Sequence, residues 1–423
     1  MKKSLLFSAA LLAASSAAVA QNGVTVLPNT ADNYTMGFVI SADGKYVAGR
    51  YSDDVTGFVS DWQTGNTATA TTDEEYEYTF MNNVANNGTA FGYVGSQAAT
   101  IAIDGTTKFY GDSAIIKDGT NDATTMVGNE YNNDLMYPHA VIWDAEGNMT
   151  HLPEPTDAWA GFVVNGTSAE FITDDKQTIV GYMVDDMYTC PLVVWHLNRD
   201  GKTYSVDPTL AKKYFAEGWD TEHPYIIFMP TGLSNNGQWV ALTVNDQNYF
   251  YGMARYDLVN DVLEVSMSDD DSQYIYTTGI ADDGTMLGYI GYGEAIIWKA
   301  GAEKYTTLAE AFPGATKLAD FDANGDHAPF GISADGRYIV GQGYLAPEDE
   351  EQYYNDCYTY VLDTQDENAT SAVKSVKQDT NASAASTTVK ARYNLAGQRV
   401  GNRQHGISIL KMGDNSTRKV LKK

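Results

Sequence analysis

One short phrase recurs seven times along this chain of 423 residues. In most copies an apolar strand end meets an acidic or amide residue and glycine, followed by apolar residues and usually a second glycine. The clearest copies are Ile40–Gly49 and Ile332–Gly341; weaker ones begin at Val84, Phe171, Leu233 and Ile280, and one near residues 115–128 is distorted by extra residues. Asp-Gly and Asn-Gly favour the positive φ of tight hairpins, so each copy predicts two antiparallel strands around a turn.

Two further strand signals follow each phrase and give a unit of four strands. After a polar loop comes an apolar run that often closes on tryptophan, as in Ala140–Trp143 and Ala295–Trp298, and then a short strand, as in Asn148–Pro153. Units spaced by roughly 36 to 61 residues match the four-stranded blade of a β-propeller, for which about 40 to 50 is usual. Seven units predict an all-β, seven-bladed β-propeller.

The ends of the repeat array predict how the ring closes. A propeller must join its first and last blades without leaving open strand edges. Gly23–Pro28 resembles the fourth-strand phrase Asn148–Pro153, and the last blade runs into polar sequence after its third strand, Tyr358–Leu362. We therefore expect the N-terminal strand to complete the seventh blade, with a plain surface strand at Gly23–Pro28 as the alternative.

The first twenty residues predict a secretory signal peptide. Two lysines precede the apolar run Leu5–Ala13, and the small residues Ala18–Ala20 supply a cleavage site. The apolar run is too short to span a membrane. We expect an exported protein at the cell surface or outside the cell, with the periplasm as the alternative location, and without a transmembrane span.

Charge is divided unevenly along the chain. Residues 371–423 carry eleven Lys or Arg against two Asp, whereas residues 21–370 carry fourteen basic and fifty-three acidic residues. A body this acidic repels nucleic acid and anionic membrane surfaces, so no nucleic-acid partner is expected. The basic tail is predicted to be a separate functional piece.

The two cysteines, Cys190 and Cys357, enter the same third strand of the predicted fourth and seventh blades. Blades three apart lie on nearly opposite sides of a ring, far beyond the Cα separation of about 7 Å that a disulfide tolerates. The repeat register therefore predicts two unpaired thiols, even in an oxidising compartment.

The chain after the repeats divides into a linker and a small module. Residues 366–390 are rich in Asp, Asn, Ser, Thr and Ala and have too few apolar residues to fold, which predicts a flexible linker. Residues 391–423 contain three short strand signals. The predicted organisation is a signal peptide at 1–20, a propeller at 21–365, a disordered linker at 366–390 and a C-terminal β module at 391–423.

The C-terminal module resembles the sorting modules of exported Bacteroidota proteins, in which a Tyr-Asn-Leu-x-Gly-Gln-x-Val phrase precedes Gly-Ile-x-Ile and a basic end. The matching segments are Tyr393–Val400, Gly406–Ile409 and Lys419–Lys422. The resemblance implies export through a type IX secretion route, with the export machinery as a partner of this module, and attachment at the cell surface. It covers about thirty residues, shorter than the usual sorting domain.

The blades are similar to the extracellular Ser-x-Asp-Gly repeats of bacterial exported propellers, through the phrase Ile-Ser-x-Asp-Gly-x-x-Val-x-Gly at Ile40–Gly49 and the Ala-x-x-Trp strands at Ala140–Trp143 and Ala295–Trp298. Those families are mostly binding proteins or proteins of unassigned activity. The likeness implies a propeller and adds little about chemistry.

One acidic segment upstream of the last copy has the start of a calcium loop. Alternating Asp, Asp and Asn with glycine at the sixth place is the first half of an EF-hand-type loop, and the candidate ligands are Asp320, Asp322, Asn324 and Asp326. The twelfth place, where a bidentate glutamate belongs, is Gly331. Structural calcium is one hypothesis, and an acidic turn between blades is the other.

Catalytic motifs are scarce. The six histidines have no metal-ligand spacing, and the sequence contains no Gly-x-Ser-x-Gly elbow and no phosphate-binding glycine loop. Paired carboxylates such as Asp53-Asp54 and Asp185-Asp186 could supply a glycosidase acid and base. In a chain this acidic such pairs are also expected by chance, so no catalytic residue is assigned.

Tyrosine, Asn and Asp gather in the loops that join second and third strands, which in a propeller lie on one face with the links between blades. Flat rings stack while amides and carboxylates form hydrogen bonds, a composition suited to polyol or peptide recognition. The predicted ligand-binding residues are Tyr51, Asp53, Asp54, Tyr131, Asp185, Asp186, Asp246, Tyr249, Tyr289, Tyr292 and Tyr344. Ordinary polar loops are the alternative interpretation.

These observations predict an exported, monomeric propeller that binds a glycan or protein ligand on one face. The rival hypothesis is a propeller hydrolase or lyase that acts on polysaccharide through carboxylates at the channel mouth.

Overall fold

The computed structural model describes residues 20–30, 32–72, 77–131, 137–155, 164–185, 192–207, 225–246, 248–270, 273–291, 293–323, 327–345, 356–370, 389–393, 399, 406–412 and 417–422. The chain divides into two compact units, Met1–Thr370 and Ser371–Lys423. The predicted signal peptide, apart from its last residue, and residues 371–388 of the predicted linker lie outside the described residues.

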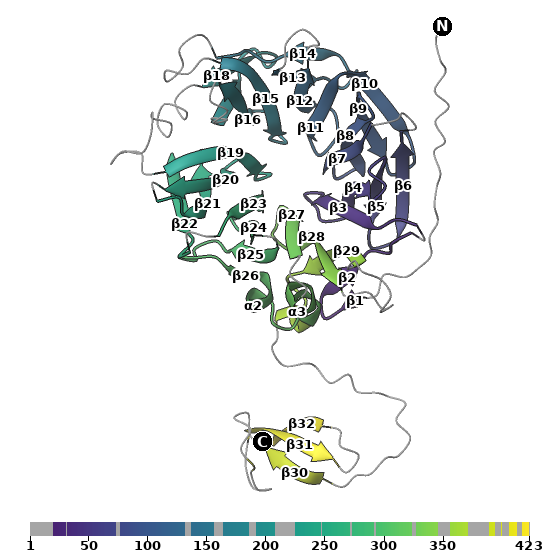
Figure 1. Cartoon of the computed structure of the whole chain (residues 1–423), viewed down its shortest axis with the longest axis vertical. Helices are drawn as coiled ribbons and strands as arrows, with labels where there is room; N and C mark the ends of the chain where they lie inside the picture. The colour runs from purple at the N-terminus through teal and green to yellow at the C-terminus, as the bar shows by residue number, and fades with distance from the viewer. Residues whose placement is uncertain are drawn as a thin grey trace. The chain divides into compact units, whose positions relative to one another are not determined.

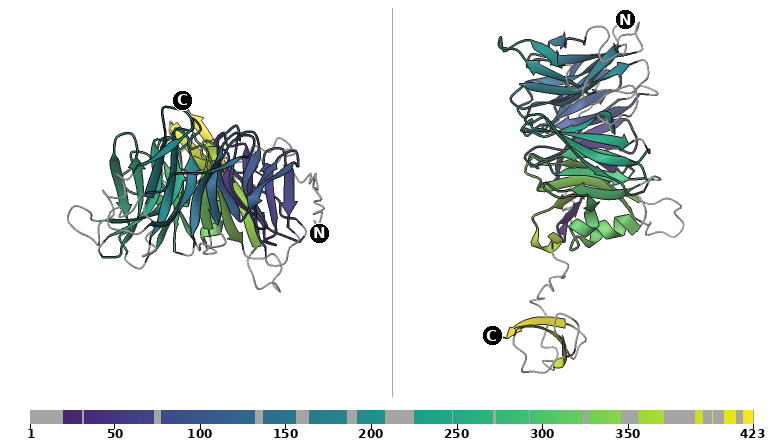
Figure 2. Two further views of the ribbon diagram at one scale, coloured as in Figure 1. Left: turned by 90° about the horizontal axis from the view of Figure 1, so that it is seen from above. Right: turned by 90° about the vertical axis from the view of Figure 1, so that its left-hand side faces the viewer.

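Seven antiparallel sheets are arranged around a central axis in the first unit, which confirms the predicted seven-bladed β-propeller (Figure 1). Seen from the side, each sheet is a blade whose strands run between the two faces of the ring (Figure 2). In every blade the first strand of the repeat is innermost and the later strands lie progressively outward.

The first six blades each contain four consecutive strands. Blade 1 is β3 (Thr35–Ile40), β4 (Tyr46–Tyr51), β5 (Thr56–Asp61) and β6 (Asn66–Thr71); blade 2 is β7 (Thr79–Val84), β8 (Thr89–Val94), β9 (Gln97–Ala102) and β10 (Thr107–Asp112); blade 3 is β11 (Ala114–Gly119), β12 (Met126–Tyr131), β13 (Pro138–Trp143) and β14 (Met149–His151). Blade 4 is β15 (Val164–Ile172), β16 (Thr178–Asp185), β17 (Leu192–Leu197) and β18 (Tyr204–Asp207); blade 5 is β19 (Tyr225–Leu233), β20 (Trp239–Asp246), β21 (Tyr251–Asp257) and β22 (Val262–Met267); blade 6 is β23 (Ile275–Ile280), β24 (Met286–Ile290), β25 (Glu294–Trp298) and β26 (Thr306–Thr307).

The seventh blade joins the two ends of the ring. It contains β27 (His327–Ile332), β28 (Tyr338–Leu345) and β29 (Asp356–Asp363), followed outward by β2 (Val24–Val26) and β1 (Ala20–Gln21) from the N-terminus. Val24 pairs with Leu362, and Val26 pairs with Tyr360. The predicted closure by the N-terminal strand is confirmed.

Three short helices lie at this closure: α2 (Leu308–Ala311), α3 (Thr316–Ala323) and α4 (Glu367–Thr370). α4 belongs to the first unit, because Ala369 is fully buried and its carbonyl accepts a hydrogen bond of 2.9 Å from the Gly314 amide. The first compact unit therefore includes α4 and extends to Thr370.

The second glycine of the repeated phrase permits a β-bulge in the innermost strand. Each of the seven innermost strands shifts register once against its neighbour at this point, and one extra residue is left without a partner in the ladder. A Cβ at Gly49 would clash with the carbonyl oxygen of Met36, and one at Gly181 with that of Ser168. Blade 5 has Leu242 at the corresponding position, and its ladder contains a second irregularity, between Ile227 and Pro230.

In five blades the first glycine of the phrase makes the turn, as predicted, and in blade 4 Lys176, with φ 62°, takes its place. Gly44 has φ 75°, and its amide donates to the Ser41 carbonyl at 2.8 Å. In blade 3, however, Asp118 and Gly119 lie inside β11, and Ala123, with φ 57°, makes the turn. The distortion of the third copy is therefore a displaced turn.

Residues of these turns also link the blades: six of the links join neighbouring blades, and one, from Asn121, joins blade 3 to blade 5. The links are Asp43 N to Asn86 Oδ1, Asn87 Nδ2 to the Asp122 carbonyl, Asn121 N to Asp174 Oδ1, Asn121 Nδ2 to Asn235 Oδ1, Asn236 N to Asp282 Oδ1, Asp282 N to the Ala334 carbonyl and Ala334 N to the Ala42 carbonyl. Together they form a belt of hydrogen bonds around one mouth of the ring.

The tryptophans at the third strands pack between blades. Trp143 and Trp195 are fully buried, and the Trp195 indole N–H donates to the Pro153 carbonyl of the preceding blade at 2.8 Å. Cys357 is buried in β29, with its Sγ 4.0 Å from Gln342 Oε1. Cys190 lies outside the described residues, so the predicted absence of a disulfide between the two cysteines stays a prediction.

The second unit contains a three-stranded antiparallel sheet of β30 (Val389–Tyr393), β31 (Gly406–Met412) and β32 (Thr417–Lys422). These are the three strands predicted for the C-terminal module. Within the part of the chain that the structure describes, no helix is long and apolar enough to cross a membrane.

Candidate functional site

The bulges place one side chain from every blade at the wall of a central cavity. The seven extra residues are Phe38, Asn82, Lys117, Glu170, Thr231, Thr278 and Phe330, which we call the hub ring. All seven line a cavity of about 570 Å³ on the propeller axis. The cavity also touches turn residues such as Asn121 and Asn235, so it lies toward the mouth bounded by the belt of turns.

The ring is divided chemically into an aromatic side and a polar side. On the aromatic side, Phe38 lies 4.7 Å from Phe80 and 5.3 Å from Phe330 between ring centroids. On the polar side, Thr278 Oγ1 donates to the Pro329 carbonyl at 2.8 Å, and Thr231 Oγ1 lies 2.6 Å from Thr277 Oγ1. The threonine hydroxyls are thus engaged by neighbouring blades.

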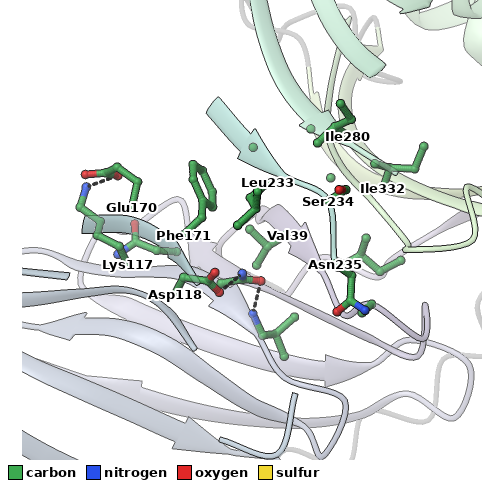
Figure 3. Close-up of a pocket in the computed structure, with 18 of the residues that line it drawn as sticks. Val39, Lys117, Asp118, Glu170, Phe171, Leu233, Ser234, Asn235, Ile280 and Ile332 are labelled. Carbon is green, nitrogen blue, oxygen red and sulfur yellow. Dashed lines mark hydrogen bonds and ion pairs between the residues drawn. The ribbon is translucent and has the colours of Figure 1, made fainter. Parts of the chain in front are cut away.

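The charged part of the cavity wall is an ion pair between blades 3 and 4 (Figure 3). Lys117 Nζ lies 3.5 Å from Glu170 Oε2, and the two side chains are 25% and 14% exposed. Glu170 Oε1 also accepts a hydrogen bond of 2.5 Å from Ser168 Oγ, which in turn accepts one of 2.8 Å from Asn129 Nδ2. The pair is held in place and still reaches the cavity, so it can both donate and accept hydrogen bonds there.

Asp118 is a buried carboxyl beside this pair, and it ties three blades together. Its Oδ2 accepts from the Ile172 amide at 2.8 Å, and its Oδ1 accepts from the Gly119 amide at 2.7 Å and from Asn83 Nδ2. Burial is the largest influence on this group and raises the pKa of Asp118 to about 7; the nearby Glu170 charge adds to the rise, while the three donors oppose it.

The raised pKa of Asp118 predicts a loss of stability as the pH rises. The folded state binds this proton more tightly than the unfolded state, whose Asp has a pKa near 3.8. The contribution to the free energy of unfolding is therefore complete below about pH 4, declines up to about pH 7 and is constant above that. At about 1.4 kcal/mol per pKa unit, the decline is about 4 kcal/mol.

Urea unfolding of the wild type and Asp118→Asn between pH 4 and 8 measures this effect. We expect the variant to lack the decline, so that the stability of the wild type relative to the variant falls across this interval. An amide at residue 118 has one acceptor atom fewer than a carboxyl, so one of the three donors loses its hydrogen bond. This loss lowers the stability of the variant by the same amount at every pH. A difference between the two proteins that is constant from pH 4 to 8 would contradict the assignment.

Those predicted ligand-binding residues that the structure describes lie near the other ends of the strands and do not line this cavity. Several have structural contacts: Tyr51 is buried against Phe58, Asp53 accepts from the Val55 and Thr56 amides, and Asp54 pairs with Arg50 at 2.6 Å. Asp246 accepts from the amides of its own turn.

Other members of the predicted set differ in exposure. Tyr131 and Tyr249 are 41% and 63% exposed, while Tyr289 and Tyr344 are partly buried in β24 and β28. Asp186, Tyr292 and the side chain of Asp185 lie outside the described residues. A role of this set in ligand binding stays a prediction.

The candidate calcium ligands fall at a helix end. Asp320 and Asp322 lie in α3, and Asn324 and Asp326 lie outside the described residues. Asp322 Oδ1 is 2.6 Å from His327 Nδ1, so this carboxylate already has a partner. Among the described residues, no group of three or more His, Cys, Asp or Glu is arranged to hold a metal ion. Calcium binding here stays a prediction.

The hub ring was not identified from the sequence, although a positional signal for it exists. Every hub-ring residue lies six positions before the residue of positive φ that makes the turn, as Phe38 does before Gly44 and Glu170 before Lys176. The ring residues share no chemical type. The position recurs while its chemistry varies, as expected for positions that adapt one scaffold to a ligand.

No protein-family model matches this chain, and no curated protein matches it. Among solved structures, the chain is similar to an oligogalacturonate lyase in complex with manganese (12% identity, 85% of this chain and 96% of that chain, TM-score 0.49). It is also similar to a streptogramin B lyase (12%, 80% and 97%, TM-score 0.46) and to a puromycin hydrolase (9%, 89% and 58%, TM-score 0.48). At such identities the likeness concerns the path of the chain, and no residue role follows from it.

Proposed function

We propose that this protein binds a neutral carbohydrate in the hub cavity. The observation that carries the proposal is the combination, in one cavity of about 570 Å³, of an aromatic wall and a fixed ion pair on different blades. Ligand pockets of this volume with few, well-placed polar groups are suited to small molecules or the end of a chain. The face of a sugar ring can pack on Phe38 and Phe330, while its hydroxyls bond to Lys117 and Glu170.

Charge selects against an acidic ligand. The cavity wall carries Lys117 against Asp118, Glu170 and Asp174, and the body around it is strongly acidic. An anionic sugar would therefore meet a field of its own sign. A neutral glycan is the ligand class that uses both the rings and the hydrogen-bonding groups. A protein ligand is the alternative from the sequence.

A hydrolase or lyase is the second candidate, and one observation favours it. Asp118 and Glu170 both line the cavity, and the pKa of Asp118 lies near 7, where a general acid is useful. Against this, Asp118 accepts hydrogen bonds from protein groups of three blades, so its carboxyl is engaged in joining blades. Release of reducing ends or unsaturated products from the bound glycan, lost in both Asp118→Asn and Glu170→Gln, would favour catalysis over binding.

For its setting we propose export and attachment at the cell surface. The predicted signal peptide at residues 1–20 and the motif in residues 391–423 support this proposal. Detection of the intact protein on the outside of cells, and its loss from that location after removal of residues 391–423, would be the expected observations.

A glycan array followed by calorimetry tests ligand binding. We expect neutral oligosaccharides to bind and acidic ones to fail. Glu170→Gln is expected to weaken binding by about tenfold or more, because a hydrogen bond to a charged acceptor contributes about 1.5–3 kcal/mol. Glu154→Gln is the matched control: Glu154 also has a side-chain partner, His139 at 2.5 Å, but it is 42% exposed and does not line the cavity. Equal affinities for both variants, or no glycan bound at all, would contradict the proposal.

A further inference from the structure

Four tyrosines of blades 5 and 6 form a cluster at the mouth opposite the belt of turns. Tyr251 begins β21, Tyr274 precedes β23, Tyr276 is in β23 and Tyr289 is near the end of β24. Tyr274 and Tyr276 are two residues apart in an extended segment, so their side chains point to the same side. Only one of the four, Tyr289, belongs to the set predicted from the sequence.

The rings are paired, and Tyr274 and Tyr276 are about half exposed while Tyr251 and Tyr289 are partly buried. The Tyr251 and Tyr274 centroids are 4.8 Å apart, and Tyr276 stacks on Tyr289 at 5.1 Å with 23° between the planes. Tyr274 is 54% exposed and Tyr276 is 47% exposed. The rings are thus fixed in position by their neighbours, and they present large flat areas to solvent without a loss of side-chain freedom on binding.

The surroundings of these rings are polar and acidic. The Ser268 amide donates to the Tyr251 carbonyl at 2.8 Å, and the segment that then leads to Tyr274 carries Asp269 and Asp270. The turn before Tyr251 contains Asp246, and Lys304 nearby is neutralised by Asp269 at 2.7 Å. An anionic partner is repelled here, and the flat rings are bordered by hydrogen-bonding groups.

We propose that Tyr251, Tyr274, Tyr276 and Tyr289 form a second carbohydrate-contacting surface, the tyrosine platform, which holds the flat face of a neutral polysaccharide. The proposal rests on the proposed carbohydrate ligand and adds a site next to the hub cavity, since the ring of Tyr289 lies 6.3 Å from that of Phe330. The two sites lie toward opposite mouths of the ring. The cavity accommodates a small sugar or a chain end, and the platform accommodates a stretch within a chain, so one molecule can contact a polymer at two places.

Adsorption to insoluble neutral polysaccharides tests the platform. The full protein is mixed with cellulose, xylan, mannan and starch particles, and the bound fraction is measured for the wild type, the double variant Tyr274→Ala/Tyr276→Ala and Tyr276→Phe. We expect the double variant to lose adsorption by about tenfold, because two stacking surfaces are removed, and Tyr276→Phe to retain most of it because the ring remains. Tyr78→Ala is the matched control, since Tyr78 is also 54% exposed but belongs to blade 2.

The result separates the platform from the cavity. Calorimetry with soluble oligosaccharides is expected to show unchanged affinity in the platform variant, while Glu170→Gln loses that affinity and keeps adsorption. If the cavity proposal is wrong, Glu170→Gln will leave the affinity for soluble oligosaccharides unchanged, while adsorption to the insoluble polysaccharides will still depend on the tyrosines. Wild-type protein that adsorbs to none of the four polysaccharides, a double variant that adsorbs like the wild type, or a platform that binds only peptides would overturn the platform proposal.

Discussion

Deletion of residues 20–28 is expected to abolish cooperative folding of the propeller. Those residues supply β2, the strand that covers β29 and joins the last blade to the N-terminus. Beyond the ladder of β2 and β29, the Leu27 amide donates to the Thr359 carbonyl at 2.8 Å. Without β2, β29 would become an exposed edge next to an uncovered core, which favours opening and aggregation. Circular dichroism and urea unfolding measure the loss.

Point variants keep this prediction testable if the deletion does not yield soluble protein. Val24 is 1% exposed and Val262 is 46% exposed, so the same substitution can be compared at both positions. Val24→Ala is expected to cost about 2 kcal/mol through lost burial and a cavity, and Val262→Ala well under 1 kcal/mol. Removal of residues 371–423, a separate compact unit, is expected to leave the stability of the propeller unchanged. Equal stability of the two valine variants would argue against the closure.

Gly181→Ala is expected to destabilise the protein by about 3 kcal/mol. This is the upper end of the usual cost of overpacking, because main-chain atoms must move to make room for the added Cβ. An added Cβ would clash with the carbonyl oxygen of Ser168, a main-chain atom held in the β15–β16 ladder. The bulge that carries Glu170 would then be flattened or the two strands forced apart. Loss of unfolding free energy together with loss of ligand affinity is the expected combination.

Gly279→Ala provides the comparison within the same kind of strand. Gly279 is in the innermost strand of blade 6, and the nearest atom to an added Cβ is 3.5 Å away, an ordinary contact. We expect its effect on stability to lie within about 0.5 kcal/mol, as for substitutions that meet no obstacle. If both alanine variants lost stability equally, the bulge would not be the reason for the second glycine of the phrase.

Much of the fold could be predicted because it is encoded by a local signal repeated seven times. Turn glycines such as Gly44 and strand-end tryptophans such as Trp195 have direct local causes, positive φ and packing between blades. The closure by Val24–Val26 followed from the need to cover an edge. The displaced turn of blade 3 could not be located, because Asp118-Gly119 resembles the turn signal and Ala123 does not, although Ala123 adopts the turn conformation.

The site was harder to predict, because its residues are defined by position and differ in chemistry. Phe38, Lys117 and Thr231 have nothing in common as residue types, and only the bulge brings them to the same wall. The carboxylate that matters most in the structure, Asp118, was interpreted as a turn residue. Tyr274 and Tyr276 were missed because they lie in a link between blades and at the start of an inner strand, outside the loops that join second and third strands.

The most direct test of the central claim is a crystal structure of the protein with a neutral oligosaccharide selected on the array. The claim predicts electron density for a sugar inside the hub, packed against Phe38 and within hydrogen-bonding distance of Lys117 and Glu170. A sugar bound only on the outer strands or loops, with the hub occupied by water alone, would contradict it.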